Sequence, residues 1–429
     1  MYNILSDMNA LYEAFKASVR GSKWKRDSQL FGINVLPNLA SLKREVENRT
    51  YSTEKGTEFK HNERGKIRHI HGASVRDRTI RHCLCDNILG PNLARYLIHN
   101  NGASQKGKGL AFTRQQFERD LHNFWLKYRD NDGYVGFLDL SKFYDNIRHD
   151  EIRKSIMPKI PEDSRWLFDK IIKHFEVDVS YMSDEEFSRC LDKKFNSVEY
   201  YETIKKWQKT GEKFMKKSVE IGDQVSQDIG VFFPTPLDNY AKIVRSQKWY
   251  GRYMDDIYLI CRTKEEVQSV FAGIKEQAEK IGLYINDNKT RIVKLSSVYK
   301  FLQIKYTLTE TGKVIKRVNP ANVTRERRKI KAYKRLLDNK RMSYNNIEQS
   351  VKSWIGSYAK IMSKKQIQNM KALYEKLFGK ELSWKRQSNS KTKRKWLLSR
   401  TAIASYWARN LISQRTYPKL PLKKNSAQK

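Results

Sequence analysis

The stretch KWYGRYMDDIYLI, residues 248–260, places two adjacent carboxylates, Asp255 and Asp256, inside a segment that is otherwise aromatic and branched. Aromatic and branched residues favour strands, so we predict two short strands joined by a tight turn at the acidic pair. Two buried carboxylates without partners repel each other and lose hydration, which raises the pKa of at least one of them. A divalent cation removes that cost, and Mg²⁺ prefers one or two carboxylates together with the phosphates of a substrate.

A complete metal site needs a further carboxylate, and Asp139 is the best candidate because it ends the apolar run YVGFL at residues 134–138. We expect the strand interior to give way to a turn there, so that the side chain faces a cleft. Asp139 and Asp255 would then hold two ions about 3.5–4 Å apart, an arrangement that activates a 3′-hydroxyl and stabilises the leaving oxygen of a phosphoryl transfer. Polymerisation of nucleotides fits this chemistry, although an Asp-Asp turn alone is common.

The composition points to a polyanionic partner. The chain has 429 residues, enough for roughly two or three domains at about 150 residues each, and 85 Lys and Arg against 47 Asp and Glu give a net charge of +38. Such an excess favours nucleic acid over an anionic membrane surface.

No apolar run approaches the roughly 20 residues of a spanning helix, and we expect no secretory signal and a cytoplasmic location. The four cysteines form no paired spacing, so neither zinc nor disulfides are expected.

The chain divides into segments of different periodicity. Residues 64–82 alternate basic and apolar residues and predict a strand, a turn and then a helix, while YVGFLDL at 134–140 predicts a buried strand followed by a helical SKFYDNI segment. A polar stretch from about 158 to 217 is typical of a mainly helical insertion. After residue 320 we predict three amphipathic helices, with apolar positions at Ile330, Tyr333, Leu336, Leu337, Val351, Trp354, Tyr358, Ile361, Ile367, Met370, Leu373, Tyr374 and Leu377.

The third of these helices carries end signals, because Ser363 with Gln366 forms a capping box and Gly379 suits its C-terminus. Beyond it, residues 385–396 are typical of a cationic loop, residues 397–412 of a short helix and residues 421–429 of a disordered end.

Several motifs, in order, resemble those of reverse transcriptases. YMDD resembles the catalytic hairpin of that family, and FLDLSKFYDNI resembles its first aspartate motif. The other segments that carry the resemblance are IGDQVSQDIGVFFPTPLD (221–238), the lysine motif LYINDNKT (283–290), the primer-grip segment VYKFLQIKY (298–306), and, for the fingers of bacterial members, KIRHIHGASVRDRTIRH (66–82) and NNGASQKGKGLAF (100–112). The chain departs from the family where Glu220-Ile221 precede Gly222, at Asp228, where an apolar residue is usual, and at Gln303, where glycine is common.

The resemblance implies an α+β right-hand polymerase with fingers, palm and thumb, in which the palm is an antiparallel sheet backed by helices and the thumb is helical. The domains implied are an N-terminal basic helical extension (1–60), fingers (61–133), a palm (134–310) with a fingers-like helical insertion at about 158–217, a helical thumb (316–415) and a disordered basic tail (416–429).

Residue roles follow from the resemblance together with the chemistry. Asp139, Asp255 and Asp256, with the carbonyl of Leu140, are expected to bind metal. Tyr144 falls where the family places an aromatic steric gate against the ribose 2′-hydroxyl, with a core aromatic as the alternative.

A second group of residues is expected to handle the nucleotide. Lys66, Arg68 and Arg76 would neutralise the incoming triphosphate or, equally, contact the template backbone. Lys289 would protonate the leaving pyrophosphate or pair with its charge. Gly222 and Gln227 would shape the floor under the templating base, and Asp145 is expected to be structural.

The function implied is an RNA-directed DNA polymerase that uses two Mg²⁺ ions, with Mn²⁺ as a substitute, and that binds an RNA template, dNTPs and a cDNA product. Within the family, the sequence resembles the bacterial antiviral defence and diversity-generating groups. The residues before Gly222 and the insertion at about 158–217 favour the defence group, whose template is a structured non-coding RNA. The alternatives are a diversity-generating or retron-type enzyme, an RNA-dependent RNA polymerase and a catalytically weak RNA-binding scaffold. The primer and the oligomeric state stay open.

Overall fold

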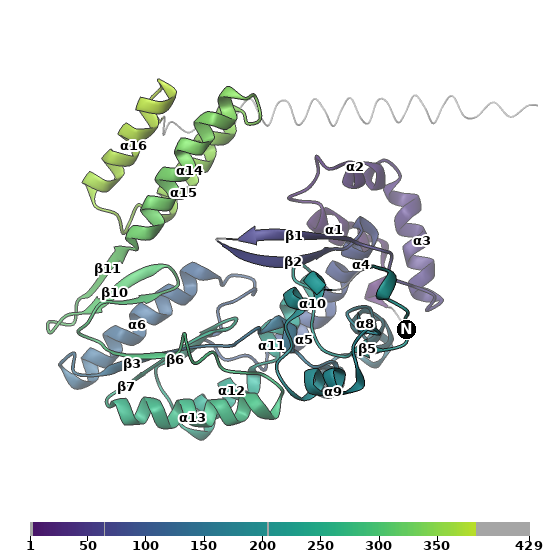
Figure 1. The fold of residues 1–429 in the computed structure, drawn as a ribbon, viewed down its shortest axis with the longest axis horizontal. Helices are drawn as coiled ribbons and strands as arrows, with labels where there is room; N and C mark the ends of the chain where they lie inside the picture. The colour runs from purple at the N-terminus through teal and green to yellow at the C-terminus, as the bar shows by residue number, and fades with distance from the viewer. Residues whose placement is uncertain (1–2, 64, 204–205, 383–429) are drawn as a thin grey trace, which may run out of the picture. The chain divides into compact units, whose positions relative to one another are not determined.

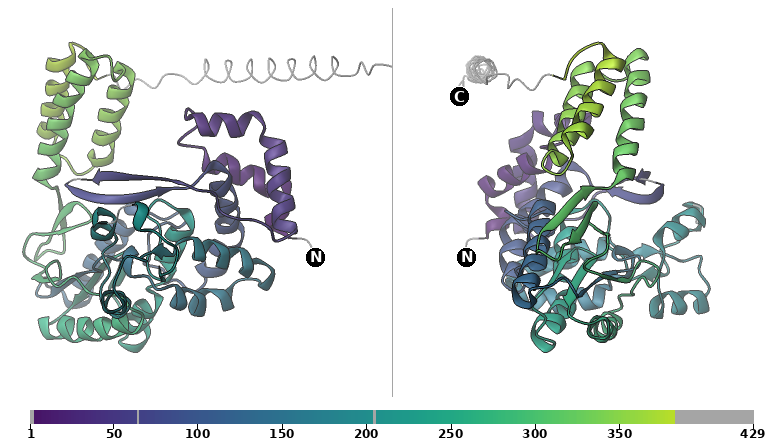
Figure 2. Two further views of the ribbon diagram at one scale, coloured as in Figure 1. Left: turned by 45° about the vertical axis from the view of Figure 1, so that its right-hand side comes forward. Right: turned by 90° about the vertical axis from the view of Figure 1, so that its left-hand side faces the viewer.

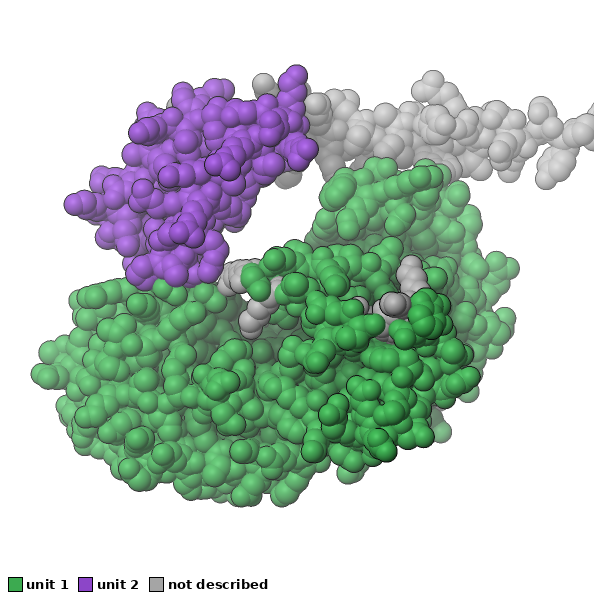
Figure 3. Space-filling view, viewed as in Figure 1, with its two compact units in different colours: residues 1–319 green, residues 320–429 purple. Residues whose placement is uncertain are grey.

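The computed structural model describes residues 3–63, 65–203 and 206–382, without the side chains of Lys66, Tyr201 and Lys206. It forms two compact units, residues 1–319 and residues 320–429 (Figure 3). The cationic loop, the last helix and the basic tail that the sequence predicts after residue 384 lie outside the described residues.

The first unit is organised around a four-stranded antiparallel sheet with the order β6-β7-β3-β8. Its strands are β6 (Tyr250–Tyr253), β7 (Asp256–Cys261), β3 (Tyr134–Asp139) and β8 (Arg291–Lys294). The central strands β3 and β7 are almost wholly buried because both of their faces are covered. The two apolar runs predicted as strands therefore form the centre of one sheet.

Helices cover the two faces of this sheet (Figure 1). On one face lies α13 (Lys264–Lys280), and it approaches so closely that a Cβ at Gly136 would lie 2.5 Å from Val267 and 2.6 Å from Phe271. On the other face lies α6 (Leu110–Tyr128), whose Phe117 ring packs 4.9 Å from the ring of Tyr258. The expected palm, an antiparallel sheet backed by helices, is confirmed.

A buried ion pair connects the sheet to the helices at residues 224–239. The Arg252 guanidinium and the Asp238 carboxylate, both 0 % exposed, are joined by hydrogen bonds of 2.7 to 3.1 Å. Arg252 also donates to the carbonyls of Val231 (2.8 Å) and Met254 (3.1 Å). These contacts join β6 to α11 (Gln224–Phe232), to α12 (Thr235–Asn239) and to the turn before β7, and the π-helical turn η6 (Tyr240–Val244) follows α12 directly.

The N-terminal part of this unit is helical and then forms a hairpin. Its helices, with a short 3-10 turn η1 (Ile4–Ser6), are α1 (Met8–Ser18), α2 (Arg26–Ile33), α3 (Val35–Glu47), α4 (Val75–Leu84), the π-helical η2 (Cys85–Leu89) and α5 (Gly90–Ala94). Between α3 and α4, β1 (Thr57–Glu63) pairs with β2 (Lys66–Gly72), and Figure 2 shows this hairpin extending away from α4. The predicted strand, turn and helix at 64–82 are thus confirmed, whereas β1 already begins within the range 1–60 that was expected to be helical.

The segment after β3 begins with less helix than the sequence predicts. Further along the chain it forms a small subdomain. The expected helix at SKFYDNI is only one 3-10 turn, η3 (Tyr144–Asn146). The following elements are α7 (His149–Ile156), η4 (Met157–Lys159), α8 (Glu162–His174), β4 (Val177–Asp178), α9 (Asp184–Asp192), α10 (Ser197–Thr203), η5 (Lys206–Gln208) and β5 (Phe214–Met215). The insertion is mainly helical as predicted, and its β4–β5 pair, which was not predicted, closes a separate core around Val179, Phe195 and Met215.

A three-stranded sheet, β9 (Tyr299–Phe301), β10 (Ile304–Leu308) and β11 (Val314–Val318), completes the first unit and packs on α6 through Phe301 and Phe117. Gln303, at the turn between β9 and β10, has φ +73°, which explains why glycine suits this position.

The second unit contains the three predicted helices, α14 (Pro320–Asp338), α15 (Tyr344–Tyr358) and α16 (Lys364–Phe378). The buried side chains include Ile330, Val351, Met370 and Tyr374, which the helical spacing predicted. The capping box of Ser363 and Gln366 is present, and Gly379 ends α16 in the left-handed conformation.

We predict that Asp238→Asn destabilises the protein by about 3–5 kcal/mol, because the change leaves the Arg252 guanidinium buried without a counter-charge. Urea unfolding measured by circular dichroism tests this. The control is Asp150→Asn, which removes the partner of Arg148 in a half-exposed pair and should cost no more than about 1 kcal/mol. An equal loss of unfolding free energy in the two variants would contradict a stabilising role for the buried Arg252–Asp238 pair.

Candidate active site

The three carboxylates of the predicted metal site lie at the same end of the central strand pair. Asp139, the last residue of β3, lies directly opposite Asp256, the first residue of β7, so their side chains leave the same face of the sheet. Asp255 lies in the two-residue turn before β7, where Met254 has φ +58°, and the carbonyl of Asp255 accepts a 3.3 Å hydrogen bond from the Leu140 amide. Segments more than a hundred residues apart thus bring their acids together.

The surroundings of Asp255 and Asp256 disfavour the ionised form of these two carboxylates. Burial raises the pKa of Asp255, and the charge of Asp139 raises it further. Burial, followed by the charges of Asp255 and Asp139, raises the pKa of Asp256 to about 7. The end of the strand pair is therefore a concentrated negative site.

Lys289 supplies the nearest compensating charge. Its ammonium donates hydrogen bonds of 2.7 Å to both carboxylate oxygens of Asp139. Asn286, from the same loop, donates 3.1 Å from its side-chain amide to Oδ2 of Asp139 and 2.8 Å from its backbone amide to the Asp139 carbonyl. The sequence singled out Lys289 but missed Asn286, although Asn286 lies in the same lysine motif.

The oxygen-rich cluster fits a divalent cation by charge and donor type. In this conformation no three His, Cys, Asp or Glu side chains of the described residues converge as a metal-binding group, and Lys289 holds both oxygens of Asp139. Hard divalent ions prefer carboxylate oxygens, and the raised pKa values of Asp255 and Asp256 show that positive charge is needed here. The donor set fits such an ion once the ammonium releases Asp139.

Leu140 follows Asp139 directly and is buried in an isolated β-bridge with Ile285. Its amide contacts the turn of the acidic hairpin, so its backbone lies beside the carboxylates. Asp145 instead turns away and accepts hydrogen bonds from the hydroxyl (2.7 Å) and amide (3.3 Å) of Ser197, which is the arrangement of a structural residue.

Tyr144 lies close to the acidic turn. Burial raises the pKa of its phenol, and the charge of Asp255 raises it further. A Cβ at Gly230 of α11 would lie 3.2 Å from the Tyr144 hydroxyl and 3.2 Å from the Met254 sulfur. Gly230, which the sequence did not single out, therefore lets α11 approach both the tyrosine and the turn.

The three predicted phosphate-binding cations lie in different surroundings. Arg68, on β2, pairs with Glu63 at 3.0 Å, and its charge partly offsets the raised pKa of Asp255, so it lies within electrostatic range of the cluster. Arg76, on α4, is held by Glu45, by Asp77 at 2.9 Å and by the Ser52 carbonyl at 3.0 Å. The structure thus does not bring Arg76 to the acidic cluster, and its contacts are those of a structural residue. The side chain of Lys66 lies outside what the structure describes.

The predicted floor residues lie between α11 and the β1–β2 hairpin. Gly222 has φ +108°, a conformation that favours glycine, and a Cβ there would lie 3.5 Å from Ile70 of β2. Gln227 is exposed on α11, and its side-chain carbonyl accepts a 3.4 Å hydrogen bond from Ser104. Gly222 therefore borders the β1–β2 hairpin, and Gln227 borders the loop at 100–112.

The unusual residues before Gly222 also have a structural explanation. Arg81, which is 1 % exposed, donates to Asp223 at 2.6 Å and to Glu220 at 3.3 Å. Burial raises the pKa of Glu220 to about 7, although Arg81 lowers it in part. Glu220, which departs from the family pattern, thus gives the buried Arg81 a second partner beside Asp223.

Comparison with known proteins agrees with this geometry. Residues 60–307, more than half of the chain, match the family described as reverse transcriptase (RNA-dependent DNA polymerase), and the chain belongs to that family. A search of curated proteins finds no match. Among solved structures, the chain is similar to telomerase from Candida albicans, solved with a fragment of telomeric RNA, at 11% identity and a TM-score of 0.41. The match covers 78% of this chain and 60% of the telomerase chain.

The chain has the polymerase fold that the sequence predicted, with the acidic cluster at the end of the central strands of its sheet. Among the described residues, no helix combines the length and the hydrophobicity needed to cross a membrane.

Proposed function

We propose that the protein is an RNA-directed DNA polymerase. The observation that carries the proposal is the pairing of Asp139 with Asp256 beside the Asp255 turn, in a chain that belongs to the reverse transcriptase family. In this proposal the fingers, palm and thumb have the bounds that the sequence analysis gave, and the partners are an RNA template, dNTPs and the cDNA product.

The cofactor we propose is Mg²⁺, bound as two ions, with Mn²⁺ as a substitute. Asp139, Asp255 and Asp256, with the Leu140 carbonyl, would hold it. Bound there, divalent ions supply positive charge to the attacking and leaving oxygens of phosphoryl transfer. A metal would also supply the positive charge that offsets the burial and the mutual repulsion raising the pKa values of Asp255 and Asp256.

The residues of the chain have distinct roles in this mechanism. Lys289 neutralises Asp139 in the free protein, and its ammonium, when released, pairs with the charge of the leaving pyrophosphate or donates a proton to it. Arg68 and Lys66 contact the triphosphate. Gly222 and Gln227 shape the surface under the templating base.

Asp255→Asn and Asp256→Asn should each reduce dNTP incorporation on a primed RNA template by at least about 100-fold, because each removes a charged ligand while keeping the shape of the side chain. The measurement is primer extension with Mg²⁺ in excess, alongside RNA affinity by fluorescence anisotropy, which should change little.

Asp287→Asn is the matched control, because Asp287 is an exposed carboxylate in the loop that carries Lys289 and should leave extension unchanged. Undiminished synthesis by the Asp255 and Asp256 variants would refute the polymerase proposal. Parallel loss of RNA binding would instead favour a scaffold whose acids stabilise the fold.

Tyr144→Ala should raise the use of ribonucleotides relative to deoxynucleotides by about tenfold or more. The reason is that the ring lies beside the acidic turn, where its removal opens space for a 2′-hydroxyl. Single-nucleotide extension with paired dNTP and rNTP measures the ratio.

Tyr144→Phe is the control, since it keeps the ring and should keep the ratio. If both variants retain the discrimination of the natural protein, Tyr144 is a core aromatic and not a gate. Preferential use of ribonucleotides by the natural protein would favour an RNA-dependent RNA polymerase.

For the biological role we propose bacterial antiviral defence, in the cytoplasm, with a structured non-coding RNA as template. The motifs at 100–112 and 221–238 resemble both the defence and the diversity-generating groups, and the unusual residues before Gly222 together with the insertion at about 158–217 favour defence. The net charge of +38 suits a large RNA partner. Sequencing of the RNA that co-purifies with the protein, and of the cDNA made during phage infection, identifies the template. A cDNA copied from a repeat within a phage-tail-like gene would favour a diversity-generating enzyme instead.

A further inference from the structure

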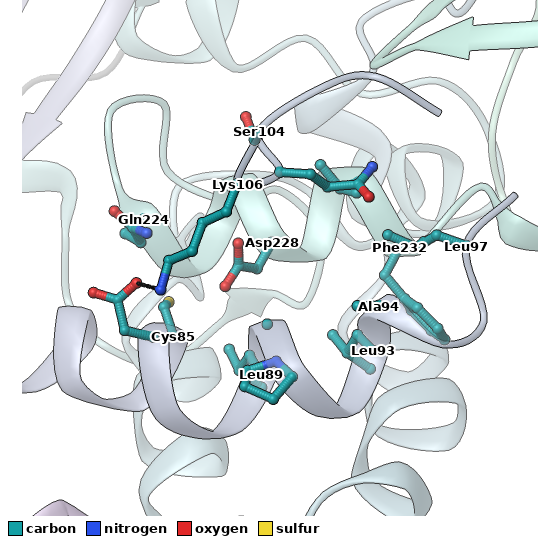
Figure 4. Close-up of a pocket in the computed structure, with 15 residues that line it drawn as sticks. Cys85, Leu89, Leu93, Ala94, Leu97, Ser104, Lys106, Gln224, Asp228 and Phe232 are labelled. Carbon is teal, nitrogen blue, oxygen red and sulfur yellow. Dashed lines mark ion pairs between the residues drawn. The ribbon is translucent and has the colours of Figure 1, made fainter. Parts of the chain in front are cut away.

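A cavity of about 540 Å³ lies in the first unit, apart from the acidic cluster. Three parts of the chain enclose it: the helical stretch η2–α5, the loop at residues 104–106 and one side of α11 (Figure 4). Its lining residues include Leu89, Leu93, Ala94, Leu97 and Phe232, and they provide apolar surface against which a flat ring can pack.

One carboxylate enters this apolar cavity from α11. Figure 4 shows Asp228 extending toward the space between Cys85 and the side chain of Lys106. The Cys85 thiol is a weak hydrogen-bond donor to Asp228, and no lysine or arginine among the described residues forms an ion pair with it. Burial therefore raises the pKa of Asp228 to about 7. A half-buried acceptor in this state gains from a ligand that brings N–H donors.

A cation stands at the rim of the same cavity. The side chain of Lys106 is 88 % exposed and pairs with Asp86 at 3.5 Å. Such an exposed pair holds its lysine weakly, so the ammonium is available to an anionic group of a ligand. The cavity thus combines apolar walls, the Asp228 carboxylate and a rim cation, Lys106, that is paired with a second lining carboxylate, Asp86.

We propose that this cavity binds an unpaired guanine base through Asp228, with the phosphate of the same nucleotide near Lys106. Guanine displays two adjacent N–H donors, N1–H and the 2-amino group, which match the two oxygens of a carboxylate. Adenine and cytosine place an acceptor beside their amino group, and uracil places its N–H between two carbonyls, so each of these bases sets an acceptor against the carboxylate. The inference extends the proposed function, since an RNA-handling protein meets such bases, but it concerns a site away from the carboxylates that bind metal.

The first test compares GMP with IMP by isothermal titration calorimetry on the full chain, without divalent metal. IMP lacks only the 2-amino group, so it should bind about 5- to 100-fold more weakly than GMP. A phosphate site elsewhere on this basic protein would bind both alike. Equal affinities would therefore overturn the proposal.

Two variants locate the discrimination. Asp228→Asn keeps the size of the side chain but replaces one acceptor by a donor, and it should abolish the preference for GMP over IMP. Ala94→Trp fills the cavity and should abolish GMP binding while Asp228 is retained. Glu276→Gln, at an exposed position on α13, makes the same change in charge and should bind as the natural protein does. Circular dichroism confirms that each variant is folded, and a preference that survives both cavity variants would place the site elsewhere.

A second experiment distinguishes a guanine within RNA from a free guanine nucleotide. A single-stranded RNA 12-mer with one guanine is compared with the same RNA carrying inosine, by fluorescence anisotropy. Weaker binding of the inosine RNA, lost in Asp228→Asn, identifies a base within RNA, whereas discrimination with GMP alone identifies a free nucleotide. Both arms measure equilibrium binding without synthesis, so a failure of the polymerase proposal leaves this test unaffected.

Discussion

The repulsion among Asp139, Asp255 and Asp256 is the constraint around which the first unit is built. The three acids lie at the end of two buried strands, and burial, followed by the charges of Asp255 and Asp139, raises the pKa of Asp256 to about 7. Lys289 compensates Asp139 in the free protein. A divalent cation would compensate the charge of these acids, and in the proposed reaction the Lys289 ammonium would then be free to pair with the leaving group.

The surrounding fold holds these acids in place. The register of β3 against β7 sets Asp139 opposite Asp256, and a slip of one residue would turn one of the two side chains to the other face. Arg252 fastens the turn before β7 to α11 and α12 by binding Asp238 and the Met254 carbonyl. Gly230 then allows α11 to approach Tyr144 and Met254. The three acids, Tyr144 and the Arg252–Asp238 pair thus depend on one another through packing that covers both faces of the sheet.

Much of this arrangement was predictable because the decisive signals are local. Apolar runs bounded by acids specify β3 and β7, and Ser363 with Gln366 marks the start of α16. Contacts between distant segments were not predictable. Arg76 has the charge of a phosphate ligand, but Glu45 and Asp77 occupy its guanidinium. The role of Asn286 follows only from its two hydrogen bonds to Asp139. The strands β4 and β5 are too short to show the alternating hydrophobic pattern of a strand.

The most direct test of the central claim is an anomalous-scattering experiment on crystals of the protein grown with Mn²⁺ and a non-hydrolysable dNTP. The account predicts a Mn²⁺ peak bound by carboxylate oxygens of Asp139 and Asp255, with the Lys289 ammonium displaced from Asp139. A map with no peak at these residues, and with Lys289 still bound to both oxygens of Asp139, would contradict it.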